Sequence, residues 1–171
     1  MPLAVRHPTG RKASRHPRGI HLPGAAVDRA EGQPVELQDN KVLVRRFIDE
    51  AQNKGNFGVI DELCADNFVD HSPLPGLPPT REGLRILFGL LRAAFPDLRV
   101  VISEQIAEDE RVVTRKTFVG THGGEFLGLP PTGNHVEFEV IDILTIRGQR
   151  IAEHRVVFDQ LGLLRQLGAA V

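Results

Sequence analysis

The stretch Asn134–Gly168, NHVEFEVIDILTIRGQRIAEHRVVFDQLGLLRQLG, decides how the whole chain is interpreted. Two alternating runs flank Arg147-Gly148-Gln149, a pattern that predicts a β-hairpin, and an apolar tail follows. Asp142 and His154 interrupt an otherwise apolar set of positions. A carboxylate and an imidazole on an apolar face are costly unless they are paired or used. The apolar set occupies even-numbered positions, namely Val136, Phe138, Val140, Leu144, Ile146, Ala152, Val156 and Phe158.

The length of the hairpin loop decides whether Asp142 and His154 share a face. A two-residue turn at Gly148-Gln149 would place Asp142 opposite Arg155, as a surface ion pair. A three-residue loop ending on a left-handed Gly148 would make even positions face even positions. This second register buries the apolar set together, which favours it by several kcal/mol at about 25 cal/mol per Å² of apolar surface. We therefore expect Asp142 and His154 together on the inner face.

The chain before the hairpin changes from a helical period to a period of two. This order predicts an α+β fold, in which a cone-shaped, curved antiparallel sheet packs on three N-terminal helices. Such a sheet leaves an apolar pocket between its concave face and the helices. The expected helices start at Asp39, at about Phe57 and after Thr80, and the second of them ends at Cys64. A short extended piece follows at Phe68–His71, and the expected strands start at Leu98 and Arg111.

Length, charge and cysteine content narrow the class of protein. The 171 residues predict one domain. The net charge is −1, and residues 1–27 contain five basic and no acidic residues, so the remainder carries −6. An acidic body argues against a nucleic-acid partner. The single cysteine excludes an internal disulfide. The apolar runs are too short to span a membrane, and no signal peptide is visible, so we expect a cytoplasmic protein.

Two regions differ in composition. Residues 1–36 are rich in Pro, Gly, Arg and His and show no hydrophobic period. They predict a disordered basic arm, for which a tether to a polyanion is the functional alternative. Residues 37–171 are expected to form the folded domain.

The candidate site residues come from the hairpin and from three other places. Asp142 is the candidate base, and His154 is its orienting partner. Asp70 and His71 lie where the helices give way to the sheet, and His122 begins a Gly-rich loop. Asp159 is a pocket carboxylate or an anchor for the tail.

A metal centre would have to draw ligands from two separate parts of the chain. Asp70, His71, Asp142 and His154 could supply two imidazoles and two carboxylates. No metal-ligand spacing lies within a single element, so we predict no metal. No phosphate-binding or nucleophile motif is present either.

Three segments make the chain resemble the SnoaL-like polyketide cyclases, or ester cyclases, of the nuclear-transport-factor-2-like superfamily. They are GTHGGEFLGLPPTG (120–133), VIDILTIRGQRIAEHR (140–155) and DQLGLLRQLG (159–168). The resemblance implies a SnoaL-like α+β barrel over residues 37–171 around a deep apolar pocket. It also implies a homodimer and no metal or organic cofactor. The implied activity is intramolecular aldol ring closure of an aromatic polyketide methyl ester.

The resemblance also assigns positions in the pocket. The acid/base carboxylate of the family falls immediately after Arg155, where this chain has Val156. A pocket histidine of the family falls at Asp142, and a polar residue at the pocket mouth matches Asp70. Val156 and Phe158 are therefore expected to line the pocket. The carboxylate role remains open only in a relocated form, with Asp142 as the base.

Three functions follow. The first is a cofactor-independent cyclase or isomerase that takes a proton from a small apolar carbonyl compound. In it, the apolar setting of Asp142 is expected to raise its pKa. The second is a non-catalytic module that binds a hydrophobic molecule in the same pocket. The third is an epoxide-hydrolase-like enzyme that uses Asp142, Arg155 and Asp159, which requires the two-residue register.

Overall fold

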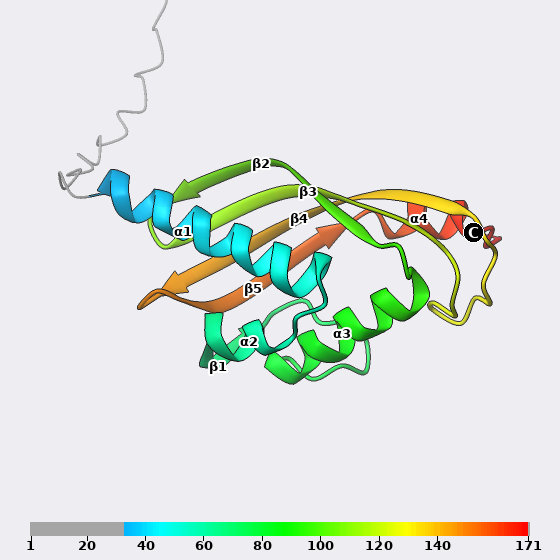
Figure 1. The fold of residues 1–171 in the computed structure, drawn as a ribbon, viewed down its shortest axis with the longest axis horizontal. Coiled ribbons are helices and arrows are strands. Elements are labelled where there is room, and N and C mark those ends of the chain that lie inside the picture. Colours follow the sequence, from blue (N-terminus) through cyan, green and yellow to red (C-terminus); the bar gives the residue numbers. More distant parts are fainter. Residues whose placement is uncertain (1–32, 171) are drawn as a thin grey trace, which may run out of the picture.

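A single five-stranded sheet forms the body of the protein (Figure 1). The computed structural model describes residues 33–170. The strand order is β1-β5-β4-β3-β2, and all neighbours are antiparallel except β1 and β5, which run parallel. The fold is therefore α+β with a mostly antiparallel sheet. The strands are β1 (Cys64–Asp70), β2 (Arg99–Glu108), β3 (Arg111–Thr121), β4 (His135–Arg147) and β5 (Arg150–Phe158).

Helices cover the inner face of this sheet. The longest, α1, lies along the sheet, and α2 and α3 lie beside it on the same side in Figure 1. The C-terminal helix packs against β4. Among the described residues, no helix is long and apolar enough to cross a membrane. The helices are α1 (Gln33–Phe47) with its π-helical continuation η1 (Ile48–Asn53), α2 (Gly58–Leu63), α3 (Arg81–Ala94) and α4 (Gln160–Gln166).

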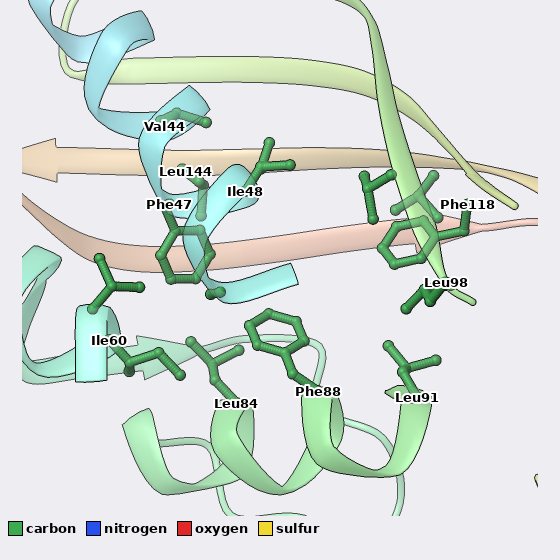
Figure 2. Packing of buried hydrophobic residues seen from close by; sticks show 14 of the residues in the cluster. Val44, Phe47, Ile48, Ile60, Leu84, Phe88, Leu91, Leu98, Phe118 and Leu144 are labelled. Atoms are coloured by element: carbon green, nitrogen blue, oxygen red, sulfur yellow. The ribbon is translucent and has the colours of Figure 1, made fainter. Parts of the chain in front are cut away.

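The core lies between α1, α3 and the inner face of the sheet (Figure 2). Phe47 and Phe88 meet there, with ring centroids 6.0 Å apart. The inward positions alternate along β4, as the period of two predicts, so its apolar even positions are buried. The strands β3 and β4 also stack Phe118 on Phe138, with centroids 5.3 Å apart.

The boundaries differ from the predicted ones in three places. The first helix begins at Gln33 rather than at Asp39, so the arm predicted for residues 1–36 ends earlier. Cys64 does not end a helix but begins β1. The short extended piece around Phe68 is part of that strand, and it joins the sheet in parallel with β5. The rest of the predicted arm, residues 1–32, lies outside the described residues.

The π-helical turn at the end of α1 fixes one edge of the sheet. The side chain of Asn53 donates to the carbonyl of Val100 (3.1 Å) and accepts from the amide of Val100 (2.7 Å). Arg92 of α3 donates to the carbonyls of Gln52 (3.2 Å) and Asn53 (2.8 Å). A π turn holds more residues than an α turn and is often found at functional sites. Here it presents Gln52 to the interior, where the side chain is buried.

Candidate functional site

The hairpin of β4 and β5 reaches the expected arrangement by an unexpected route. Gly148 and Gln149 form a two-residue turn, with φ of 55° and 60°, between paired Arg147 and Arg150. Left-handed values at both central residues are those of a type I′ turn. The predicted three-residue loop is therefore wrong. A bulge follows at once, because Ile146 pairs with Ile151 whereas Thr145 pairs with Glu153.

The bulge restores the predicted facing of the strands. Ala152 is the extra residue, and one extra residue moves every later side chain to the other face. Asp142 therefore pairs with Val156, and Leu144 pairs with His154. Even positions face even positions, and Asp142 and His154 share the inner face as expected.

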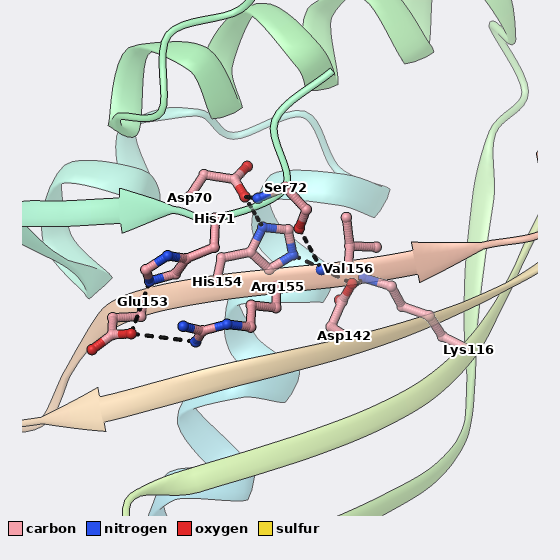
Figure 3. Close-up of polar contacts among 9 residues, drawn as sticks. All are labelled: Asp70, His71, Ser72, Lys116, Asp142, Glu153, His154, Arg155 and Val156. Atoms are coloured by element: carbon pink, nitrogen blue, oxygen red, sulfur yellow. Dashed lines mark hydrogen bonds and ion pairs between the residues drawn. The ribbon is translucent and has the colours of Figure 1, made fainter. Parts of the chain in front are cut away.

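Asp142 and His154 contact each other directly (Figure 3). His154 Nε2 lies 3.4 Å from Asp142 Oδ1. Both residues are buried, with 3% of Asp142 and 9% of His154 exposed. Because an isolated charge at this depth would be strongly disfavoured, each group depends on its partners.

The end of β1 supplies a second carboxylate to the imidazole. Asp70 Oδ1 lies 3.2 Å from His154 Nδ1, which is ion-pair distance, although the direction is not that of a good hydrogen bond. Asp70 is buried and accepts from the amide of Ser72 (3.0 Å). Ser72 Oγ in turn accepts from the amide of Val156 (2.7 Å). The predicted pocket residue Asp70 therefore belongs to the same cluster as Asp142 and His154.

Lys116 completes the cluster, and sequence reasoning missed it. Its ammonium group pairs with Asp142 Oδ2 and donates to Gln52 Oε1 (3.0 Å). It also lies 5.2 Å from the ring centroid of Phe118. Only 1% of Lys116 is exposed. A signal was present in the sequence, because Lys116 occupies an inward position of β3, between buried Thr114 and Phe118.

These contacts determine the protonation of the cluster. Burial favours neutral Asp142, but Lys116 and His154 outweigh burial and lower the pKa of Asp142 to about 2. The expectation of a raised pKa is therefore wrong, because it considered the apolar surroundings without the cation. Burial likewise disfavours the imidazolium, but Asp142 and Asp70 raise the pKa of His154 to about 9. The pKa of Asp70 is lowered, because His154 and the Ser72 amide outweigh its burial. At neutral pH, Asp142 and Asp70 are therefore carboxylates and His154 is an imidazolium.

Three members of the cluster, Asp142, His154 and Lys116, form part of the wall of an apolar cavity of about 90 Å³. Val156 and Phe158 line this cavity, as expected. Leu163 of α4 is also part of the wall, as is Ser72. Most of the remaining wall is apolar and includes four phenylalanines, Phe88, Phe118, Phe126 and Phe138. The polar groups therefore face a space whose other walls suit an apolar body.

Besides Asp70, three predicted site residues lie outside the lining of this cavity. His71 points outward and contacts Glu153, with Nε2 2.9 Å from the carboxylate. Asp159 accepts from the amide of Gly162 (2.8 Å), so it caps α4, which is the anchor alternative. His122 is fully buried, where Nδ1 accepts from Thr132 Oγ1 (3.1 Å) and the ring packs on Phe95.

The Gly-rich loop after His122 has a structural role. The amides of Gly123 and Gly124 both donate to the carbonyl of Ala94, at 2.9 and 3.0 Å. They satisfy a carbonyl at the end of α3, which has no partner within the helix. A Cβ at Gly124 would lie 2.3 Å from the Ala93 carbonyl oxygen, so this approach requires glycine.

The described residues do not assemble the site that the hydrolase or the metal hypothesis requires. Arg155 pairs with Ile143 on the outer face and contacts Glu153. It is therefore on the opposite face from Asp142, and the arginine and carboxylates of a hydrolase are not brought together. Within residues 33–170, no group of three or more His, Cys, Asp or Glu side chains is arranged to hold a metal ion.

Comparison with known proteins shows the family. The sequence model of the SnoaL-like polyketide cyclases matches residues 42–167. The chain belongs to this family. It is 30% identical over 131 residues to aklanonic acid methyl ester cyclase DauD of Streptomyces sp. (strain C5), a match that covers 74% of this chain and 80% of that protein. It is 29% identical over 122 residues to nogalonic acid methyl ester cyclase of Streptomyces nogalater, covering 69% and 90%.

Solved structures show the same fold for this SnoaL-like chain. TsrD from Streptomyces laurentii superposes with a TM-score of 0.71 at 28% identity, covering 78% of this chain and 97% of TsrD. IdmH from Streptomyces antibioticus superposes with a TM-score of 0.67 at 32% identity, covering 76% and 99%. The α+β architecture expected from the sequence is therefore confirmed.

Proposed function

We propose that this SnoaL-like protein is an enzyme that moves a proton on a small apolar carbonyl compound, without a cofactor, and so closes a ring by aldol addition or isomerises the compound. One observation carries the proposal. The buried, ionised Asp142 lies beside a protonated His154 in the wall of an otherwise apolar cavity. A carboxylate next to a hydrogen-bond donor is the pair of groups that enolisation requires, as base and as oxyanion stabiliser.

The low pKa of Asp142 sets a condition on this mechanism. A carboxylate with a pKa of about 2 is a weak base as long as His154 and Lys116 hold it. A carbonyl oxygen that accepts a hydrogen bond from either cation competes with Asp142 for it. The pKa of Asp142 then rises, and the same donor stabilises the enolate that forms. Substrate binding would therefore activate the base.

The position of Asp142 supports a base relocated from Val156, where the resemblance to the family expects a carboxylate. Asp142 and Val156 are direct cross-strand partners. The Cβ atoms of such partners lie about 4.5–5.5 Å apart. A carboxylate moved from one position to the other would reach the same part of the cavity. We infer that Asp142 has taken over the role of base.

The size of the cavity supports a small substrate. The two methyl ester cyclases act, by their names, on the methyl esters of aklanonic acid and nogalonic acid. A cavity of about 90 Å³ is smaller than the engineered cavity of about 150 Å³ that binds benzene. A polycyclic ester would require the aromatic wall to move apart. We therefore favour a compact aromatic or aliphatic ketone or ester, and the homodimer expected from the resemblance stays a prediction.

The test measures exchange of the proton next to the carbonyl. Incubation in D₂O with a panel of aryl ketones and β-keto esters, followed by NMR, should show enzyme-dependent deuteration. Replacing Asp142 by Asn should slow the exchange by about 10²–10⁴-fold, the contribution typical of a general base. The folded structure should persist, as circular dichroism can check. Asp66→Asn, at a carboxylate with 87% of its side chain exposed, is the matched control and should leave the exchange rate unchanged.

One observation favours a binding module as the second candidate. The two contacts that stabilise ionised Asp142, with Lys116 and His154, also make it unreactive in the empty cavity. If no compound in the panel shows enzyme-dependent exchange, but apolar compounds still bind with shifts of the cavity-wall resonances, the binding module is correct. Exchange that is equally fast in the Asp142→Asn variant would contradict the assignment of the base.

A further inference from the structure

Lys116 has an unused hydrogen-bond donor in the cavity wall. An ammonium group carries three N–H donors and no acceptor. Among the described residues, two acceptors contact Nζ, namely the Asp142 carboxylate and Gln52 Oε1. On a further side lies the ring of Phe118, with its centroid 5.2 Å away, and Phe118 and Lys116 both line the cavity. A buried donor without an acceptor is costly, and an oxygen atom of a ligand would satisfy it.

We propose that Lys116 is a catalytic residue that binds the carbonyl oxygen of the substrate and holds the enolate oxygen as it forms, and that Gln52 is its positioning residue. The inference rests on the proposed function for the identity of the reaction. The site for an oxyanion stands independently on the geometry of the ammonium group.

The geometry links the oxygen site to the base. Lys116 contacts Asp142 directly, so an oxygen bound to Nζ places the adjacent carbon close to the Asp142 carboxylate. In the reaction, Asp142 takes the proton from this carbon. The electron pair of the broken C–H bond forms the C=C bond, and the carbonyl π electrons move to the oxygen beside Lys116. In ring closure, the enolate carbon attacks a second carbonyl carbon of the substrate, the first C=O bond re-forms, and protonated Asp142 gives its proton to the new alkoxide. In isomerisation, protonated Asp142 returns the proton to a different carbon of the enolate system.

The substrate class follows from this placement. The polar end of the cavity accepts one carbonyl group that has an acidic C–H next to it. The other walls are apolar, with phenylalanine rings among aliphatic side chains, so the remainder of the molecule should be apolar. A charged group elsewhere on the substrate would have no partner in the cavity apart from the cluster itself. Its desolvation cost would exclude such a substrate.

Gln52 holds the ammonium group from the helical side. It comes from the π-helical turn, and its backbone carbonyl is fixed by Arg92 at 3.2 Å. The next residue, Asn53, is tied to β2 through both its side-chain atoms. The side-chain oxygen of Gln52 therefore has a fixed origin, and it directs Lys116 without contributing a charge.

The test uses 4-nitrophenol as a mimic of the enolate, because only its phenolate absorbs visible light. Titration of the protein with the probe at several pH values gives separate affinities for phenol and phenolate. In the wild type, bound probe should be enriched in phenolate. Lys116→Met should lower the ratio of phenolate to phenol affinity by about tenfold or more, the value of a hydrogen bond to a charged group. Lys54→Met, at a surface lysine paired with Asp49 and Glu50, should leave the ratio unchanged.

Two further variants guard against a folding defect and separate the roles. Asp142→Asn keeps Lys116 and removes its competing carboxylate, so it should raise the phenolate preference. The double variant that combines Lys116→Met with Asp142→Asn lacks both charges, and it should lose that gain in phenolate preference. Gln52→Met should lower the phenolate ratio severalfold and leave phenol affinity nearly unchanged, whereas a merely structural role would reduce both affinities equally.

The outcomes decide between the two proposals separately. Loss of phenolate preference in the lysine variants supports the oxygen site, even if no proton exchange is ever found. An unchanged ratio in Lys116→Met, or in the double variant compared with Asp142→Asn, overturns the oxygen site, even if the protein proves to be an active cyclase.

Discussion

The two faces of the sheet use the same residue types in opposite ways. Arg115 and Lys116 are neighbours in β3 and point to opposite faces. On the outer face, Arg115 pairs with Glu139 at 2.9 Å, with 45% and 62% of these side chains exposed. On the inner face, Lys116 pairs with Asp142, with 1% and 4% exposed. An ion pair is therefore informative about function only where water is excluded.

The energies behind this difference are unequal. An exposed pair contributes between about 0 and 1 kcal/mol, because water screens it and side-chain entropy opposes it. A buried pair has a desolvation cost that its attraction barely offsets. The outer pairs therefore cost the protein little stability. The inner cluster, in contrast, is not explained by a gain in stability. The presence of this cluster next to a cavity indicates a functional role.

The largest expected effect comes from breaking the inner pair. Lys116→Met should lower the free energy of unfolding by about 3–5 kcal/mol, because it leaves a buried carboxylate without its cation. Arg115→Met, one residue away on the outer face, should lower it by about 1 kcal/mol or less. Urea unfolding of the two variants under identical conditions measures both values. Equal losses would remove the distinction between the faces.

A second variant separates the orphaned charge from the lost packing. Lys116→Met combined with Asp142→Leu replaces the pair by apolar side chains, which is often neutral or stabilising. It should recover most of the stability while showing no proton exchange. Continued instability would mean that the methylene packing of Lys116, not its charge, was responsible.

A smaller effect should appear in the pH dependence of stability. The folded pKa of His154, about 9, lies above its ordinary value of 6.5. The folded protein therefore binds more protons than the unfolded chain between these values. The stabilisation is complete below pH 6.5, and about 3 kcal/mol of it is lost as the pH rises through 9. Unfolding of the wild type and His154→Gln from pH 6 to 10 should show this alkaline loss in the wild type only.

The exposed imidazole offers the matched control for that experiment. His71 contacts Glu153 at the surface, where solvent screens the interaction. His71→Gln should therefore retain the alkaline loss of the wild type. If this variant abolishes the loss and His154→Gln does not, the assignment to the inner face is wrong.

The smallest expected effect concerns a neutral contact of the inner face. Ser72 Oγ accepts from the amide of Val156 at 2.7 Å. Ser72→Ala leaves this amide without a partner and should cost about 1–3 kcal/mol. Ser103→Ala, at an exposed position of β2, should stay within about 0.5 kcal/mol. Thermal unfolding can rank the two, and a loss for Ser103→Ala as large as that for Ser72→Ala would contradict the difference.

The sequence allowed the inner face to be predicted because alternation is a strong signal. Asp142 and His154 stood out from a buried apolar series, and the argument from burial placed them together. The combination of a two-residue turn and a bulge could not be predicted, because the side chain of the extra residue Ala152 does not mark a bulge. Burial of the apolar positions also requires only that the register is restored, whether by a longer loop or by a bulge. Lys116 occupies an inward position of β3, but lysine is usually exposed, so alternation alone does not predict a buried ion pair there.

Other parts of the site depend on three-dimensional context that a sequence does not contain. Gln52 faces the interior through a π turn, which shifts the helical period that sequence analysis relies on. The low pKa of Asp142 required knowledge of its cation. His71 and His122 shared the residue type of a site but not its place, since neither lines the cavity.

The bulge at Ala152 has a consequence for how proteins with this hairpin diverge. A substitution in β5 changes one side chain. An insertion or deletion of a single residue at the bulge would turn to the outer surface all the side chains that β5 contributes to the cavity wall. Residue-by-residue alignment across the hairpin is therefore meaningful only between chains that share the extra residue. Matching Val156 to a carboxylate elsewhere assumes a common bulge. New chemistry could arise here by a shift in strand register, with a change of only one residue in the composition of the strand.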